Sequence, residues 1–205
     1  MIKNNDMNDF DKRSYALGSN MGYSLKEMGI SSLDKDSFAQ GVMDALAGTC
    51  RLNRAELKEQ FDIINAEIEA NSQREKQEEL EKGKTFLEAN KKNEGVKETA
   101  SGLQYKVVKQ GDGRKPAATD TVKVHYHGTL IDGTVFDSSV QRGEAIEFPL
   151  NHVIAGWTEG LQLMPIGSKY ILYVPAHLAY GEQSPSPLIK PNSTLIFEVE
   201  LFDVK

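Results

Sequence analysis

The sequence predicts an α+β protein in which a helical first half precedes an antiparallel sheet packed on one short helix. Up to about Asn93, apolar residues recur at the spacing of three and four that amphipathic helices have. From Thr99 onward, short segments alternate apolar and polar residues between turn signals, as half-buried strands do. One helical segment, about Gly156 to Leu163, interrupts the strands and can cover the apolar face of their sheet.

Two short amphipathic helices are expected at the start of the chain. The first spans about Asp11 to Met28 and stops before Gly29. The second takes Asp36 as its N-cap and stops at Gly48. Because these thin helices cannot enclose a core of their own, we expect their apolar stripes to pack against a second copy of the chain.

A third, much longer helix is expected to follow. It begins at Asn53, where Asn53-Arg54-Ala55-Glu56 resembles a capping box, and could continue to about Asn93. Residues 71–79 contain no apolar side chain, so this part is either a solvated helix or a flexible linker. Its Glu, Gln, Lys and Arg residues are good helix formers and favour the helix.

Six strands are expected in the second half of the chain. Their predicted ranges are Leu103 to Val108, Thr121 to Leu130, Thr134 to Asp137, Ala145 to Phe148, Ser168 to Pro175 and Thr194 to Val204. The helix near Gly156 is expected to be the only cover of this sheet inside its domain, while Leu80, Phe86 and Leu87 of the long helix mark where that helix could dock on the domain. A fragment from about Thr99 to Lys205 is therefore expected to fold alone.

The composition is that of an ordinary globular protein and excludes several functions. The 205 residues are 39% hydrophobic and 26% charged, with a formal net charge of −6, which does not suit a nucleic-acid backbone. The single cysteine, Cys50, excludes an internal disulfide and a thiolate metal cluster. No apolar run approaches the ~18 residues of a membrane span. The polar first residues predict a cytoplasmic protein, or a periplasmic one if a leader has been removed.

The stretch from Val122 to Trp157 gathers the side chains of a candidate pocket. In its opening strand, Tyr126 takes an inward position of the alternating pattern. The chain returns through Phe136 and Asp137, which sets a carboxylate beside apolar side chains. A short apolar run then brings in Trp157, the only tryptophan.

Five sequence strings in this half resemble the FKBP-type peptidyl-prolyl isomerase domain in order and spacing. They are VHYHGTL from Val124, DGTVFDSS from Asp132, VIAGWTEGLQLMPIGS from Val153, LAYGE from Leu178 and STLIFEVEL from Ser193. The helical half is similar to the dimerisation segment of the 22-kDa bacterial FKBPs and the macrophage infectivity potentiator proteins. The resemblance implies a bent antiparallel sheet wrapped around one helix, an isomerase of X-Pro bonds, and a homodimer.

Position in these strings implies the roles of individual residues. Tyr180 would donate a hydrogen bond to a substrate carbonyl, and Asp137 would act electrostatically or by orienting Tyr126 and Arg142. Trp157 would form the floor of the pocket. The implied substrate-binding residues are Phe136, Arg142, Ile146, Val153, Ile154, Trp157, Leu188, Ile189 and Phe197. Ile146 stands where vertebrate members carry an aromatic residue, which leaves affinity for macrolide inhibitors of the family open.

Simpler interpretations of the same residues remain open. Tyr126, Phe136 and Phe197 could be plain core residues of a sheet, and Asp137 could cap a turn. The pair His125 and His127 has metal-ligand spacing, but without a third ligand we expect solvent-facing histidines.

The expected chemistry needs neither a nucleophile nor a cofactor. Rotation about an X-Pro amide has a barrier of ~20 kcal/mol, and its planar ground state is the more charge-separated one. An apolar pocket that removes water therefore lowers the barrier.

Three domains are predicted on this basis. Residues 1–52 would form a dimerisation domain, residues 53–94 a connecting helix, and residues 95–205 the catalytic domain. The partners would be unfolded or partly folded proteins that contain proline, held in part by the dimer arms in a chaperone-like way. The alternative is a catalytically idle binding module or holdase chaperone.

Overall fold

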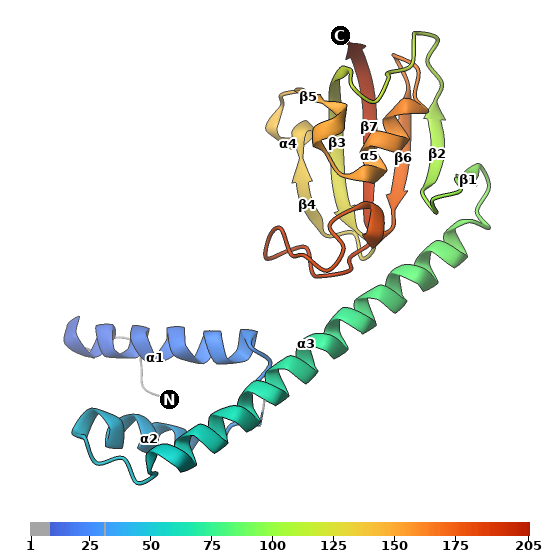
Figure 1. Cartoon of the computed structure of the whole chain (residues 1–205). Helices are drawn as coiled ribbons and strands as arrows, with labels where there is room; N and C mark the ends of the chain where they lie inside the picture. Colours follow the sequence, from blue (N-terminus) through green and yellow to red (C-terminus); the bar gives the residue numbers. More distant parts are fainter. Residues whose placement is uncertain (1–8, 31) are drawn as a thin grey trace. The chain divides into compact units, whose positions relative to one another are not determined.

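The computed structural model describes residues 9–30 and 32–205 of the chain. The polar residues 1–8, on which the expected compartment partly depends, and residue 31 lie outside the described residues. The chain divides into two compact units, Met1–Arg74 and Glu75–Lys205, and each unit is described by itself. The boundary falls inside one continuous helix, α3 (Arg54–Asn90) (Figure 1).

The first unit holds two short helices besides the start of α3. Helix α1 spans Asp9–Glu27 and α2 spans Lys35–Ala47. The N-cap of α2 is Asp34, whose carboxylate accepts the N–H of Ser37 at 2.8 Å, so the expectation of Asp36 was wrong. Asp36 lies in the first turn of α2, because the helix begins one residue before it. None of the described side chains from residue 11 to residue 74 is buried.

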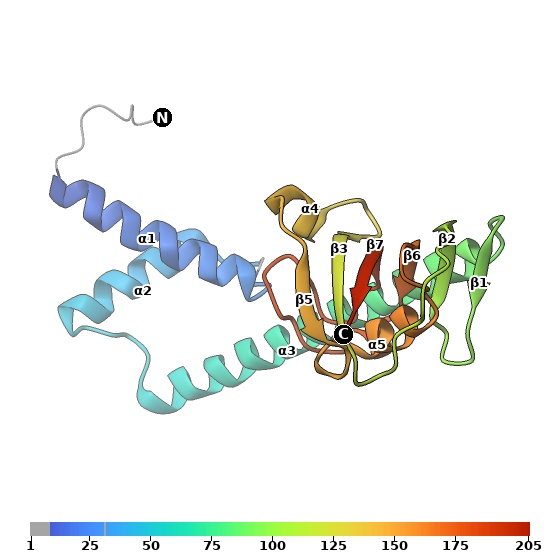
Figure 2. The same cartoon turned by 90° about the horizontal axis from the view of Figure 1, so that it is seen from above.

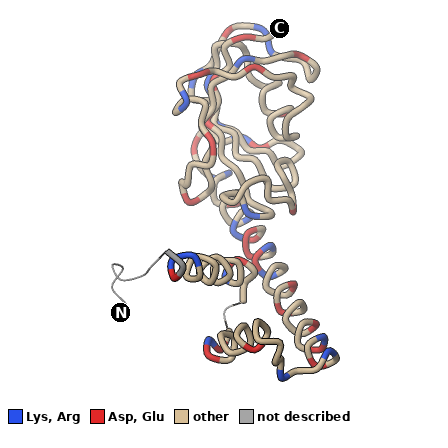
Figure 3. The backbone as a smooth tube through the Cα atoms, turned by 90° about the vertical axis from the view of Figure 1, so that its left-hand side faces the viewer, with Lys and Arg blue, Asp and Glu red and all other residues tan. Residues whose placement is uncertain are grey.

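Helix α3 starts with the predicted capping box. The Asn53 side-chain oxygen accepts the N–H groups of Ala55 and Glu56, and the Glu56 carboxylate accepts the Asn53 N–H at 2.8 Å. The helix continues through residues 71–79, which confirms the helix and excludes the flexible linker. Charges of both signs follow each other along this stretch (Figure 3). The helix ends at Asn90 and not near Asn93, because the Asn93 N–H donates to Asn90 O in a tight turn.

The second unit contains one antiparallel sheet in the order β1-β2-β6-β7-β3-β4, with β5 also paired to β3. The six predicted strands are present, and the three-residue β1 is an additional one. The strands are β1 (Val96–Glu98), β2 (Gln104–Lys109), β3 (Thr121–Leu130), β4 (Val135–Ser138), β5 (Ile146–Pro149), β6 (Lys169–Val174) and β7 (Leu195–Val204). The connections hold α4 (Ser139–Arg142), α5 (Ala155–Gln162) and the 3-10 turns η1 (Leu150–His152) and η2 (Ala176–Leu178).

The strands β4 and β5 share one edge of β3 and leave a gap between them. β4 pairs with residues 127–129 of β3, and β5 pairs with residues 121–124. The short helix α4 lies on the chain between the two strands. In the gap, the Tyr126 N–H donates to the buried Ser139 Oγ at 2.8 Å, so a side chain replaces the missing strand partner.

Helix α5 packs against one face of the sheet (Figure 2). The close approach requires glycine at two positions on α5. A Cβ on Gly156 would lie 2.4 Å from the Val174 side chain, and a Cβ on Gly160 would lie 2.7 Å from the Leu172 side chain. Trp157 and Leu161 of α5 are thereby buried in the core.

The second half of α3 also packs on this unit, at the place where Phe86 and Leu87 of the long helix were expected to dock. The Phe86 ring lies 6.0 Å from the Tyr173 ring of β6. Gln104, which is 1% exposed, accepts a hydrogen bond from the Asn90 amide and donates to Leu87 O and the Glu98 carboxylate. A fragment from Thr99 lacks these partners and the strand β1, and that it folds alone stays a prediction.

We predict that a fragment of residues 99–205 is less stable than one of residues 75–205. The shorter fragment loses all three partners of the Gln104 side chain and the strand β1. We expect a loss of about 2 kcal/mol in the free energy of unfolding. Urea unfolding followed by Trp157 fluorescence measures it. Equal unfolding midpoints for the two fragments would mean that the contacts of α3 with the sheet do not contribute to stability.

Candidate active site

A cavity of about 570 Å³ opens between α5, the sheet and the segments that follow β4 and β6. It is lined by Tyr126, Phe136, Asp137, Ile146, Phe148, His152, Val153, Ile154, Trp157, Tyr180 and Phe197. The structure thus brings together all the site residues predicted from the sequence except Arg142, Leu188 and Ile189. Phe148 and His152 were missed. Phe148 shares a face of β5 with Ile146, so strand alternation could have found it.

Aromatic rings enclose Trp157 at the bottom of the cavity. Its ring centroid lies 5.1 Å from Phe197, 5.2 Å from Tyr126 and 5.3 Å from Phe148. The contacts with Tyr126 and Phe197 are edge-to-face, at 79° in both cases, an arrangement that aromatic pairs favour. Trp157 is 5% exposed, and its indole nitrogen has no hydrogen-bond partner among the described residues. The floor of the cavity is therefore formed by packed aromatic rings, with one indole N–H that has no partner in the described part of the chain.

Three polar side chains form a closed triangle in one wall of the cavity. The Tyr126 hydroxyl donates to the Asp137 carboxylate, and the Arg142 guanidinium donates to the other oxygen of that carboxylate. The second Arg142 nitrogen donates to the Tyr126 hydroxyl at 2.9 Å. Each member bonds both others, so the triangle holds Asp137 in one orientation.

The triangle keeps Asp137 ionised. Burial by itself would raise the pKa of the Asp137 carboxyl, but the hydrogen bonds from Tyr126 and Arg142 and the guanidinium charge outweigh it and lower that pKa. Burial, followed by the bond to Asp137, raises the pKa of Tyr126, so its hydroxyl stays protonated. A carboxylate, a neutral phenol and a cation therefore stand together at neutral pH.

The short helix α4 places Arg142 outside the cavity but beside its wall. Ser138 caps α4 by accepting the Gln141 N–H, and Gly143 ends it in the left-handed conformation with a φ of 75°. Arg142 is half exposed and reaches the cavity only through its bonds to Tyr126 and Asp137.

The remaining predicted residues lie on the segment between β6 and β7. Tyr180 lines the cavity and is 38% exposed, and burial raises the pKa of its hydroxyl, with Asp137 adding to the effect. Leu188 is 50% exposed and does not line the cavity. Ile189 is 5% exposed and belongs to the hydrophobic core, so it supports the loop from beneath.

The two histidines of the pair on β3 bond to serines. His125 Nδ1 lies 3.0 Å from Ser139 Oγ, and His127 Nδ1 lies 3.0 Å from Ser138 Oγ. Among residues 9–30 and 32–205, no three His, Cys, Asp or Glu side chains are grouped to hold a metal ion. In the same described part of the chain, no helix is long and apolar enough to cross a lipid bilayer.

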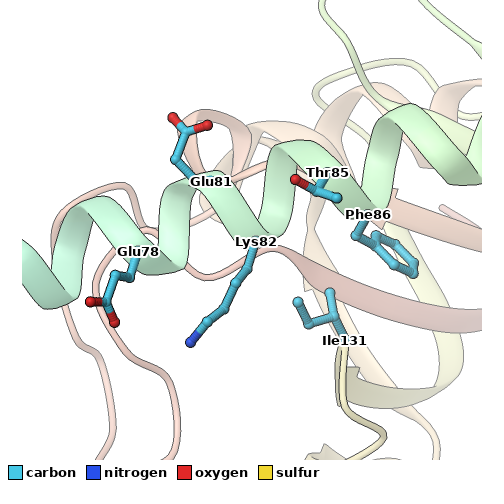
Figure 4. A pocket seen from close by; sticks show the side chains of 6 residues that line it. All are labelled: Glu78, Glu81, Lys82, Thr85, Phe86 and Ile131. Atoms are coloured by element: carbon cyan, nitrogen blue, oxygen red, sulfur yellow. The ribbon is translucent and has the colours of Figure 1, made fainter.

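A second hollow, of about 620 Å³, lies beside α3 (Figure 4). Phe86 and Ile131 form its apolar part, and Glu81 points away from them. Lys82 pairs with Glu79 at 3.7 Å. Because no group of polar side chains converges in this hollow, it does not resemble an active site.

Comparison with known proteins decides the family. The family model described as "FKBP-type peptidyl-prolyl cis-trans isomerase" matches residues 112–202, and that described as "Domain amino terminal to FKBP-type peptidyl-prolyl isomerase" matches residues 10–107. The chain belongs to the FKBP-type peptidyl-prolyl cis-trans isomerases. The resemblance seen in the sequence strings is thereby confirmed, and this member of the family is an isomerase.

Relatives with this architecture cover nearly the whole chain. The FKBP-type 22 kDa peptidyl-prolyl cis-trans isomerase of Escherichia coli strain K12 is 46% identical over 192 residues, which is 93% of each chain. The outer membrane protein MIP of Legionella longbeachae is 44% identical and covers 96% of this chain and 86% of its own. The crystal structure of FkpA from Escherichia coli matches with a TM-score of 0.78 at 43% identity over 97% of both chains. The predicted fold class is confirmed.

We predict that Trp157→Ala lowers both peptide affinity and stability. The substitution removes the floor of the cavity together with three aromatic contacts. A truncated buried tryptophan costs roughly 3 to 5 kcal/mol in the free energy of unfolding. Denaturant unfolding, monitored by Tyr fluorescence, measures the stability. Titration with a proline peptide measures the affinity. A stable variant would show that Trp157 is not part of the core.

Proposed function

We propose that this isomerase accelerates rotation about X-Pro bonds in folding proteins by desolvating the prolyl amide in the cavity over Trp157. The observation that carries the proposal is the combination of an aromatic floor with one oriented carboxylate in the wall. Catalytic roles are assigned to Asp137, Tyr126 and Tyr180.

The barrier falls because the cavity binds the twisted amide better than the planar one. In water, the planar amide is stabilised by hydrogen bonds to its charge-separated form. Rings in place of that water remove this stabilisation from the ground state and leave the less polar transition state nearly unaffected. No bond is made or broken, so no cofactor is required.

Two polar groups are proposed to orient the substrate. No hydrogen bond joins the Tyr180 hydroxyl to another described side chain, and its raised pKa keeps the proton in place to donate to a substrate carbonyl. The Asp137 carboxylate faces the cavity and acts on the amide dipole, with Tyr126 and Arg142 holding it in orientation.

The other cavity residues are proposed to bind the residues around proline. Phe136, Ile146, Val153, Ile154 and Phe197 form the apolar walls. Leu188, on the exposed loop, would contact the chain that flanks the proline, and Ile189 would hold this loop in place. Whether a macrolide inhibitor of the family binds the same cavity stays open, because Ile146 stands where vertebrate members carry an aromatic residue.

We predict that Asp137→Leu lowers kcat/KM for an X-Pro tetrapeptide at least tenfold with little change in melting temperature. Arg142 is half exposed, so it can turn to water when the carboxylate is lost, which limits the effect on stability. The assay is protease-coupled or NMR-detected isomerisation of the peptide. Asp203→Leu, the same change on an exposed position of β7, is the matched control and should behave as wild type.

A variant at Asp137 with full activity would make this residue only a turn residue. A wild-type chain that does not accelerate the tetrapeptide would favour the alternative, an idle binding module or holdase.

The helical unit is proposed to join two copies of the chain. Its apolar side chains are exposed on all three helices, and none of its described side chains from residue 11 on is buried. The large exposed ones are Tyr15, Leu17, Met21, Tyr23 and Met28 around α1, Leu33, Met43, Leu46 and Leu52 around α2, and Phe61 and Ile63 on α3. So many apolar groups on one small unit are typical of an interface.

Client binding follows from the same arrangement. Two cavities in one dimer raise the effective concentration of sites for a client with several prolines. The proposed division is dimerisation by residues 1–52, connection by residues 53–94 and catalysis by residues 95–205. The cytoplasm stays the predicted compartment, with the periplasm as the alternative after removal of a leader.

We predict that the full chain sediments as a dimer and that a fragment of residues 75–205 sediments as a monomer. Both should isomerise tetrapeptides at similar rates per cavity, because every cavity residue lies in the fragment. The fragment should lose most of the acceleration of a proline-limited refolding reaction.

The measurement is refolding rate against catalyst concentration, with tetrapeptide activity as the control. Equal slopes for the full chain and the fragment would mean that the helical unit does not capture clients. A monomeric full chain would remove the proposed interface.

A further inference from the structure

The loop from Gly181 to Asn192 is fastened to helix α3 by its last residue. We propose that Asn192 is a positioning residue of the isomerase: its amide bond to the Lys76 carbonyl fixes the ends of this loop, and with them the adjacent Tyr180 of the cavity, so that α3 sets the affinity for the peptide. The inference rests on the proposed function of the cavity over Trp157, and it adds α3 to the parts of the chain that determine peptide binding.

The backbone at Asn192 has an unusual conformation. Its φ of 63° is in the left-handed region, and it is the single non-glycine residue of the described chain with a positive φ. Asparagine tolerates this conformation better than other residues with a side chain. In this conformation the Asn192 N–H donates to Gly181 O at 2.7 Å. The bond joins the two ends of the loop, Gly181 and Asn192, which together form what we call its neck.

The Asn192 side chain then joins this neck to α3. Its Nδ2 donates to the backbone oxygen of Lys76 at 3.2 Å. A helical carbonyl has a second lone pair beyond the one used within the helix, so it can accept this additional bond. Asn192 therefore holds the loop with its backbone and the helix with its side chain.

The two residues after Asn192 continue the contact. Ser193 Oγ donates to the Glu79 carboxylate at 3.3 Å. Thr194 faces Gly83, where a Cβ would lie 2.3 Å from the Thr194 hydroxyl. The helix positions 76, 79 and 83 are spaced by three and four, so residues 192–194 follow one face of α3. The ion pair of Lys76 with the exposed Glu182, at 3.5 Å, adds little.

The fastened loop adjoins the cavity through the residue that directly precedes it. Tyr180, which precedes Gly181, lines the cavity, and Leu188 is exposed on the loop. Ser186 and Ile189 pair across the loop, and the buried Ile189 anchors it to the core. A loosened neck therefore moves Tyr180, which is proposed to donate to a substrate carbonyl, whereas Trp157 and Asp137, on α5 and β4, keep their places. Because this hydrogen bond is made to the planar and the twisted amide alike, the expected effect is on KM and not on kcat.

The test compares two variants of Asn192 in the full chain with X-Pro tetrapeptides. Asn192→Gly permits the positive φ but has no side chain to donate. Asn192→Asp keeps the shape of the side chain, but its carboxylate cannot donate to the Lys76 carbonyl. Each should raise KM about fivefold, the scale of one lost hydrogen bond, with kcat within about twofold of wild type. Asn93→Asp, the same change in the turn after α3, is the control and should leave KM unchanged.

A third variant moves the helix and leaves the loop sequence intact. In Gly83→Ala, the added Cβ would collide with the Thr194 hydroxyl and push α3 away from residues 192–194. KM should rise as it does in the Asn192 variants. The second substitution Thr194→Ala removes the hydroxyl and should restore KM toward the wild-type value. If the contact were merely structural, Gly83→Ala would lower the melting temperature, but KM would neither rise nor be restored by Thr194→Ala.

Hydrogen exchange gives a readout that does not depend on catalysis. The Asn192 and Ile189 N–H groups, which bond to Gly181 O and Ser186 O, should exchange faster in Asn192→Asp and Gly83→Ala than in wild type. Unchanged KM and unchanged exchange in both variants would overturn the proposal, even if the wild-type enzyme is active. An inactive wild type with faster exchange in the variants would overturn the function proposed for the cavity and leave the attachment to α3 standing.

Discussion

Tyr126 is held at three points, and the active site depends on all of them. Its N–H is bonded by Ser139 in the gap between β4 and β5, its hydroxyl is bonded by Asp137 and Arg142, and its ring packs against Trp157. Because the gap carries α4 in place of continuous strand pairing, the chain can place Arg142 beside the carboxylate. A continuous hairpin edge would have satisfied the backbone equally well and left no room for the triangle.

The site combines two environments that usually exclude each other. Its floor is made of aromatic rings and removes water, while its wall holds an ionised carboxylate whose charge is balanced by the Arg142 guanidinium. Arg142 and Asp137 are both close to half exposed, so their charges remain partly hydrated, and the bonds of the triangle outweigh the effect of burial on the pKa of Asp137. The apolar surface and the fixed charge therefore face the same cavity from different sides, as the proposed mechanism requires.

The sequence was informative where a local pattern determines the structure. Alternation predicted β3 with its observed ends, and the capping box predicted the start of α3, because both depend on neighbours along the chain. It did not reveal the hydrogen bonds of Gln104 to α3, since the partners are separated by up to seventeen residues and no periodicity marks them. Arg142 and Ile189 were grouped with the cavity lining by their position in a motif. The structure places Arg142 at the end of α4, beside the cavity, and buries Ile189 in the core beneath the loop. The neck at Asn192 carried no signal that strand or helix patterns could detect.

The strand β7 lies between β3 and β6, so two long stretches of backbone pairing in this unit involve the strand that is made last. As the polypeptide leaves the ribosome, β3 and β6 therefore emerge before β7, the strand that pairs with both of them. Phe197, on β7, completes the cavity only at the end of the unit's synthesis. The helices of the first unit, by contrast, have emerged long before. The dimerisation proposed for the helical unit therefore does not have to wait until the sheet of the second unit has closed.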